Sequence, residues 1–141
     1  MEGPIRLAIV DDHKMVRQTW RMILESHKDI EVVAECASGE EAIECAEKIG
    51  PDIMLMDINM KPVNGFEATR RISESFPHIK IIGISINNQP TYARNMFQLG
   101  ARGYVTKNSP PDEMFTAIFA VNNGGNYVCE DVKKFMNKGS L

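Results

Sequence analysis

The 141-residue chain has little of several features that mark specialised classes of protein. Its three cysteines, Cys36, Cys45 and Cys129, lack the close paired spacing of a zinc site or a disulfide framework, so reduced thiols are the simplest interpretation. No apolar run approaches membrane-spanning length, and the N-terminus has no charged segment followed by a long apolar stretch. We therefore expect a cytoplasmic protein without a membrane segment.

The chain also has no excess of positive charge. It contains 16 basic and 19 acidic residues, which gives a net charge of −3. Such a balance does not favour binding to a nucleic-acid backbone, so we expect no direct contact with nucleic acid. The apolar fraction of 43% is enough for one domain with a two-sided core.

Short apolar runs alternate with segments of helical periodicity along most of the chain. The runs end abruptly, as strands buried on both faces of a sheet do. The intervening segments carry helix signals, such as the capping-box pair Ser38 and Glu41. We expect strands at 5–10, 31–37, 52–56, 79–84 and 103–106, and helices at about 15–24, 38–49, 65–76, 90–99 and from about 109 onward.

This alternation predicts an α/β fold with a doubly wound, five-stranded parallel sheet and helices on both faces. The strand order that we expect is the flavodoxin-like 2-1-3-4-5. The main domain covers residues 1–123. Gly124 and Gly125 indicate a boundary, and residues 124–141 are expected to form a short helix, over 130–137, or the start of a linker, peripheral to any site.

Apolar residues of the first helix fall on one stripe, which we expect to face the sheet. Most of the nine methionines are interpreted as packing residues rather than as an adaptable binding surface. The stripe consists of Met15, Val16, Thr19, Trp20, Ile23 and Leu24, and the methionines placed at or near the core are Met15, Met22, Met54, Met56 and Met96.

Polar residues follow the expected strands at the edge where parallel strands end, which is where such sheets bind ligands. These residues are Asp11, Asp12, Asp57, Ser85 and Lys107. Three neighbouring carboxylates repel one another by roughly 1 to 4 kcal/mol per pair at a partly exposed site. A Mg²⁺ ion relieves such repulsion, and it commonly binds a few carboxylate or carbonyl oxygens, water and phosphate.

The same constellation predicts phosphoryl transfer. Lys107 provides a compact positive charge and Ser85 a hydroxyl donor, both suited to phosphoryl oxygens. Asp57 stands alone after an apolar run and is the best candidate for a nucleophile that forms an aspartyl phosphate. The adjacent Asp11 and Asp12 are better placed to hold the metal. His13, at the start of the first helix, is interpreted as a surface or capping residue rather than a ligand.

The sequence over residues 5–122 resembles response-regulator receiver domains of bacterial two-component systems. The motifs that carry this resemblance are Asp11-Asp12-His13, Met56-Asp57-Ile58-Asn59-Met60 with Gly65 closing the loop, Ile84-Ser85, and Gly103-Tyr104-Val105-Thr106-Lys107. His13, with Arg17 four residues later, is similar to the NarL/LuxR-type subgroup.

The resemblance implies a role for each residue of these motifs. Asp57 is phosphorylated, Asp12 and Asp57 bind Mg²⁺ directly, Asp11 acts largely through water, and the backbone carbonyl of Asn59 completes the protein ligands. It also implies that Ser85 and Lys107 contact the phosphoryl group and that Tyr104 is a switch residue, which would leave the surface when Ser85 moves.

Three positions depart from the family pattern. Lys61 stands where proline is common, with Pro62 one residue later, which predicts an altered path for that loop. Asn108 replaces the usual proline after Lys107. Because cis peptide bonds are almost confined to proline, we expect no cis bond between Lys107 and Asn108. Ile86 occupies a position that is usually Ala or Gly, and its side chain is expected to restrict access to Asp57.

The leading hypothesis is a switch that receives phosphate from a sensor histidine kinase, with homodimerisation as a further possibility. Its output would be control of transcription through a DNA-binding domain that this sequence lacks. The chain would not be an enzyme beyond its own phosphorylation and dephosphorylation. A phosphatase with an aspartate nucleophile would need an acid-base Asp two residues after it, where Asn59 stands. A flavodoxin-like cofactor site is disfavoured by the acidic pair after the first strand. The alternative is a docking domain that works without phosphorylation.

Overall fold

One parallel sheet runs through the middle of the molecule. The computed structural model describes residues 3–61 and 63–136. The strands lie in the order β2-β1-β3-β4-β5-β6, and every adjacent pair is parallel. They span Ile5–Val10 (β1), Ile30–Cys36 (β2), Ile53–Asp57 (β3), Lys80–Ser85 (β4), Gly103–Thr106 (β5) and Tyr127–Val128 (β6).

The predicted strand order 2-1-3-4-5 is confirmed, but the sheet has six strands rather than five. The sixth, β6, is only two residues long and pairs with β5, joining Gly103 to Tyr127 and Tyr104 to Val128. Two residues are too few for a periodic pattern, which is why the sequence did not predict this strand.

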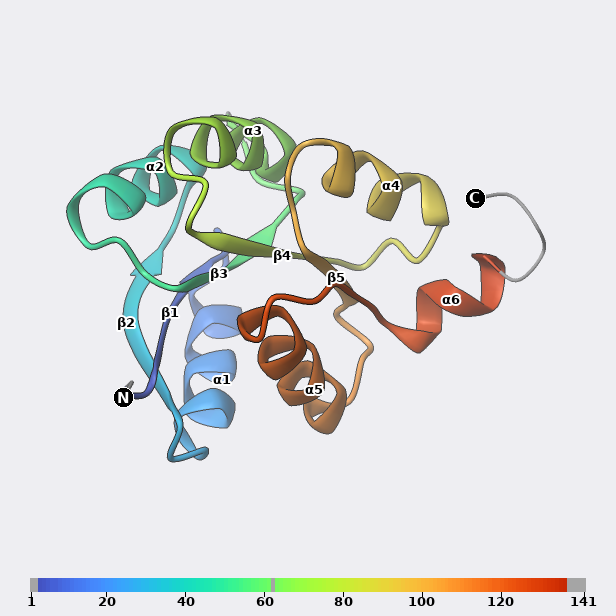
Figure 1. Ribbon diagram of the computed structural model, residues 1–141, viewed down its shortest axis with the longest axis horizontal. Helices are drawn as coiled ribbons and strands as arrows, with labels where there is room; N and C mark the ends of the chain where they lie inside the picture. Colours follow the sequence, from blue (N-terminus) through green and yellow to red (C-terminus); the bar gives the residue numbers. More distant parts are fainter. Residues whose placement is uncertain (1–2, 62, 137–141) are drawn as a thin grey trace.

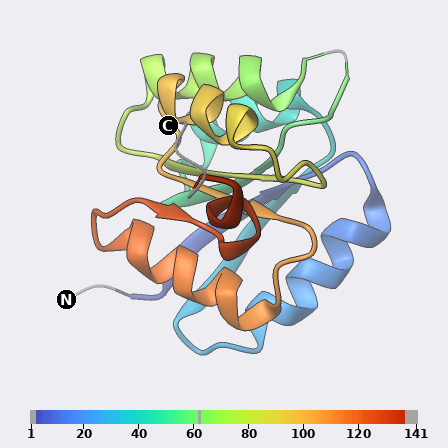
Figure 2. The same cartoon turned by 90° about the vertical axis from the view of Figure 1, so that its right-hand side faces the viewer.

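Helices cover both faces of the sheet, as a doubly wound fold requires. In Figures 1 and 2, α2, α3 and α4 lie on one face and α1 and α5 on the other. Among the residues described, no helix is both long and apolar enough to cross a bilayer. The helices span Lys14–Glu25 (α1), Gly39–Lys48 (α2), Gly65–Ser75 (α3), Pro90–Gln98 (α4), Pro111–Asn122 (α5) and Glu130–Met136 (α6).

The expectation for α1 was wrong in one respect. Of its apolar stripe only Leu24 is buried in the core, whereas Val16, Trp20 and Ile23 are half-buried. They line a groove of about 420 Å³ that also reaches Pro111 at the start of α5. Met15 and Met22 are 78% and 74% exposed, so these two methionines are not packing residues, whereas Met54, Met56 and Met96 are fully buried.

The C-terminal segment, residues 127–136, comprises β6 and α6 and lies beside β5 (Figure 1). Cys129 and Val132 are completely buried there. The backbone N–H of Cys129 donates to the carbonyl of Tyr104 at 3.1 Å, just past the β5–β6 pairing. The helix expected at 130–137 is thus present as α6, although residues 137–141 of the expected tail lie outside the described part of the chain.

Candidate functional site

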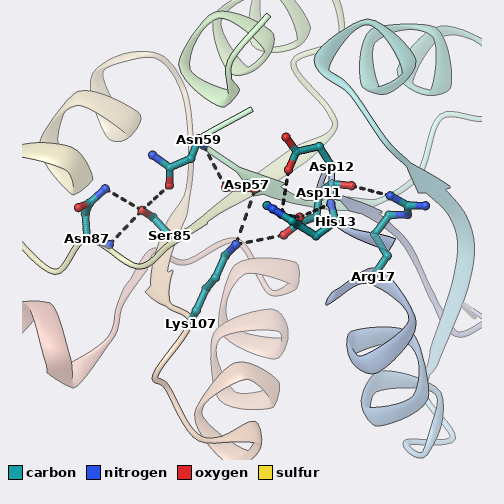
Figure 3. Close-up of polar contacts among 9 residues, drawn as sticks. All are labelled: Asp11, Asp12, His13, Arg17, Asp57, Asn59, Ser85, Asn87 and Lys107. Atoms are coloured by element: carbon teal, nitrogen blue, oxygen red, sulfur yellow. Dashed lines mark hydrogen bonds and ion pairs between the residues drawn. The ribbon is translucent and has the colours of Figure 1, made fainter. Parts of the chain in front are cut away.

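Strand register brings the polar residues of three strand ends to one edge of the sheet. Val10 pairs with Met56, so Asp11 follows β1 beside the point where β3 ends in Asp57. On the other side, Asp57 pairs with Ile84, and Ser85 follows immediately at the end of β4. Figure 3 shows that these side chains and Lys107, from just past β5, point toward one another. The predicted convergence is therefore present.

The acidic residues form one compact group. Ligand atoms of Asp11, Asp12, His13 and Asp57 all lie within 4.8 Å of one another. Asp11 and Asp57 are buried, whereas Asp12 is partly exposed to solvent. Carboxylate oxygens gathered in this way suit a hard divalent cation.

His13 lies closer to this group than its sequence position suggested. It occupies the N-cap position of α1, but its side chain makes no capping hydrogen bond. Its Nδ1 lies 3.1 Å from Asp11 Oδ1 and 3.0 Å from Asp12 Oδ1, while its backbone N–H donates to Asp11 Oδ1 at 2.8 Å. The imidazole therefore covers the outer side of the acidic pair.

Lys107 bridges the two buried carboxylates. Its Nζ lies 3.2 Å from Asp11 Oδ2 and 3.7 Å from Asp57 Oδ2. Because both partners are almost inaccessible to solvent, this ammonium group is screened far less than a surface lysine. It lies where it can also contact a negative group bound to Asp57.

The Asp57 carboxyl carries unfavourable electrostatics. Burial raises the pKa of Asp57 above its ordinary value, and the negative charge of Asp11 raises it further. The backbone N–H of Asn59, which donates to Asp57 Oδ1 at 3.0 Å, and the Lys107 ammonium partly offset this pKa increase. A carboxylate kept in such a place costs stability, which favours a functional role over a structural one.

The Ser85 hydroxyl is engaged by two asparagines. It donates to Asn59 Oδ1 at 3.0 Å and accepts from both the backbone N–H and the side-chain amide of Asn87, at 3.0 and 3.1 Å. Ser85 therefore reaches the loop after Asp57 and the loop before α4 at once (Figure 3). Its one proton would have to leave Asn59 to reach a phosphoryl oxygen.

Tyr104 does not lie at the surface, contrary to the expectation from the sequence. Its side chain is fully buried, and burial raises its pKa to about 12. The hydroxyl donates to the carbonyl of Asn87 at 2.7 Å, and the ring packs against Gly83, where an added Cβ would lie 3.2 Å from Tyr104 Cδ1. In this structure the space beneath β4 is already filled by the tyrosine ring.

Two residues shape the site through contacts that the sequence did not predict. Arg17 donates through Nη1 to the carbonyl of Asp11 at 2.8 Å and pairs with Glu35 at 3.2 Å. Asn87 holds Ser85 and Tyr104 together. The spacing of Arg17 from His13 was a usable signal because residues four apart share a helix face, whereas the contacts of Asn87 depend on a loop whose geometry no periodic pattern encodes.

Gly65 allows the loop after Asp57 to close on the strand. A Cβ at this position would overlap the carbonyl oxygen of Asp57 and would lie 2.5 Å from Ile58 Cα, both of which are backbone atoms. Asn64 caps the following helix by accepting from the backbone N–H of Glu67 at 2.9 Å. The position of the candidate nucleophile therefore depends on a glycine at residue 65.

The three positions that depart from the family pattern all lie in loops at the surface, apart from Pro62, which the structure does not describe. Ile86 is 71% exposed and follows Ser85 directly, so its side chain stands at the surface next to the site. Lys61 is exposed in the loop after β3, whereas Pro62 lies outside the described residues. Asn108 is exposed in the turn that connects β5 to α5. Restricted access to Asp57 stays a prediction.

Comparison with known proteins agrees with this geometry. Residues 7–119 match the model of the response regulator receiver domain. Over 127 residues the chain is 39% identical to the transcriptional regulatory protein DegU of Brevibacillus brevis, an alignment that covers 90% of this chain. The chain spans only 54% of the length of DegU.

Two solved structures share the fold and a recognisable part of the sequence. A LuxR-family two-component response regulator from Aurantimonas sp. is 33% identical with a TM-score of 0.92, covering 96% of this chain and 97% of that one. The isolated REC domain of RcsB from Salmonella enterica serovar Typhimurium, in the presence of the phosphomimetic BeF3−, is 26% identical with a TM-score of 0.85, covering 94% and 99%. The chain belongs to the response-regulator receiver domains of two-component systems, in the NarL/LuxR group.

Proposed function

We propose that this receiver domain is a switch operated by phosphorylation of Asp57. The observation that carries the proposal is a buried carboxylate, with its pKa raised, between a second buried carboxylate and a lysine ammonium. The phosphoryl donor would be a sensor histidine kinase, and the output would be control of transcription, as the name of DegU states for that relative. The chain itself would act as a switch rather than as an enzyme with a separate substrate.

In the proposed reaction, a carboxylate oxygen of Asp57 attacks the phosphorus of a phosphohistidine. The new bond is the P–O bond of an acyl phosphate, and the bond that breaks is the P–N bond, whose electron pair stays on the imidazole. A bound Mg²⁺ would neutralise charge on the transferred oxygens. Asp12 and Asp57 would bind it directly through their carboxylates, Asp11 would act largely through water, and the backbone carbonyl of Asn59 would complete the protein ligands. Lys107 would pair with the phosphoryl group, and Ser85 would donate to it.

The proposal is tested by incubating the protein with acetyl phosphate and Mg²⁺ and recording its intact mass. We expect a gain of one phosphoryl group that is lost on treatment with hydroxylamine, because an acyl phosphate is a reactive acylating group. A protein whose mass stays unchanged would instead support a docking domain that works without phosphorylation.

Mg²⁺ is expected to bind the acidic group in the range of affinity typical of sparse, hydrated sites. Its binding should raise the midpoint of thermal unfolding, because a ligand that binds only the folded state stabilises it. Asp12→Asn should weaken this effect more than Asp11→Asn, since Asp12 is assigned a direct bond to the ion and Asp11 a bond through water. Titration followed by Trp20 fluorescence or NMR provides the affinity. Equal or reversed effects of the two variants would contradict these ligand roles.

Ile86 is expected to slow the approach of small molecules to Asp57. Its exposed, branched side chain stands directly after Ser85. Ile86→Ala should therefore raise the rate of phosphorylation by acetyl phosphate, the rate of hydrolysis of the acyl phosphate, or both, severalfold. Replacing the equally exposed Met22, on α1, with alanine is the matched control. If neither rate differs between the two variants, crowding by Ile86 is ruled out.

A further inference from the structure

The C-terminal segment covers the part of the molecule that adjoins Tyr104. β6 pairs with β5, and the amide of Cys129 binds the Tyr104 carbonyl. Cys129, just before α6, and Val132, on α6, are fully buried. The Tyr104 side chain is itself fully buried, with its hydroxyl on the Asn87 carbonyl and its ring against Gly83.

Asp131, in the first turn of α6, anchors the segment by polar contacts. Its Oδ2 accepts from the hydroxyl of Thr106 at 3.0 Å, and its Oδ1 accepts from the side-chain amide of Asn88 at 3.4 Å. Thr106 is completely buried, and the Asp131 side chain is only 20% exposed. Lys134 also lies 3.0 Å from Asp131 Oδ1. One carboxylate thus joins α6 to the end of β5 and to the loop before α4.

A continuous set of contacts connects Asp131 to the candidate phosphorylation site. Asn88 is the neighbour of Asn87, whose backbone and side chain both donate to Ser85, and Ser85 donates to Asn59. Asn59 in turn donates its backbone N–H to Asp57. Adjoining residues thus connect Asp57 to α6 through hydrogen bonds.

We propose that the C-terminal segment is a regulatory element that docks on β5 through Asp131 and that phosphorylation of Asp57 weakens its docking. This inference rests on the proposed function. To donate to a phosphoryl oxygen, Ser85 must turn toward Asp57 and away from Asn59, and the loop at Asn87 follows because both of its donors bind Ser85. The 3.4 Å contact between Asn88 and Asp131 is the longest in the set and is the first to lengthen. By linkage, undocking of the segment also favours phosphorylation.

The first arm of the experiment tests docking without phosphorylation. Cys129 reacts with N-ethylmaleimide only when the segment opens, so its alkylation rate, measured by peptide mass spectrometry, follows the opening equilibrium. Asp131→Ala should raise this rate about tenfold, equivalent to ~1.4 kcal/mol for lost hydrogen bonds to a charged group. Glu130→Ala, which changes a side chain that is 78% exposed in the same turn, is the matched control.

A second variant guards against misfolding. Thr106→Val replaces the hydroxyl with a methyl group and nearly keeps the shape of the side chain, so it should also raise the alkylation rate of Cys129. Cys36 and Cys45, buried on β2 and α2, should react at their original rates. Docking through Asp131 is overturned if neither Asp131→Ala nor Thr106→Val raises the alkylation rate of Cys129 above that of the Glu130→Ala control.

The second arm tests the coupling. Wild-type protein is treated with acetyl phosphate and Mg²⁺, and intact mass and Cys129 alkylation are measured on the same sample, with Asp57→Asn treated in parallel. We expect phosphorylated wild type to react at Cys129 severalfold faster and Asp57→Asn to show no change. If the mass rises but Cys129 does not accelerate, the coupling is overturned while the proposed function stands. If the mass does not rise, the proposed function fails and the coupling with it.

Discussion

Asp57→Asn is expected to abolish phosphoryl uptake from acetyl phosphate. The amide has nearly the same shape as the carboxylate and can still accept the backbone N–H of Asn59, so the fold and the loop after β3 should be preserved. It lacks the negatively charged oxygen that attacks phosphorus. Intact mass after incubation measures the effect.

The matched control for this variant lies at the opposite end of the same strand. Asp52 directly precedes β3, and its carboxylate accepts from the backbone N–H of Arg6 at 2.8 Å. It therefore lies at the end of the strand that is remote from the candidate site. Asp52→Asn should gain one phosphoryl group at the wild-type rate. A phosphoryl group that persists in Asp57→Asn would move the acceptor to another residue and overturn the assignment.

Gly65→Ala is expected to lower the free energy of unfolding by about 3 kcal/mol, the upper part of the range for overpacking. The added methyl group meets the backbone of Asp57 and Ile58, which cannot rotate away as a side chain can. A loss of this size is a large share of the ~5–15 kcal/mol that stabilises a typical domain. Urea unfolding measures it, and a slower gain of phosphate is expected because the overlap displaces Asp57 itself.

Gly3→Ala is the control for this substitution, since a Cβ at Gly3 has no atom within 4 Å. It should unfold at the wild-type urea concentration. If Gly65→Ala does the same and is phosphorylated at the normal rate, the loop after β3 adjusts without cost, and the close approach of Gly65 to the strand has no role in placing the nucleophile.

The arrangement of strand ends could be predicted because it depends on long-range regularities. Apolar runs such as the one that ends at Asp57 mark strands buried on both faces, and parallel topology then places their carboxyl ends together. This reasoning placed Asp11, Asp57, Ser85 and Lys107 at one edge, and the structure brings all four there.

What could not be predicted depends on contacts that leave no periodic signal. The stripe on α1 indicated an apolar face but not its partner, and most of it lines a groove beside α5. Tyr104 was expected at the surface because nothing in its neighbours reveals that residues 127–136 return to cover β5. The role of Asn87 had no signal in the sequence, since its bonds to Ser85 depend on the local backbone path.

The short strand β6 has a consequence for self-association. An edge strand exposes unpaired backbone N–H and C=O groups and is a template for pairing with another chain. While the C-terminal segment is docked, two residues occupy that edge, and the exposed edge that remains is too short for a stable intermolecular ladder. Undocking would uncover one edge of Gly103–Thr106, a strand without charged residues. In the undocked form this edge would pair with the same edge of other copies. At high protein concentration, strand-to-strand aggregation would therefore limit the lifetime of that form unless a binding partner covered the edge.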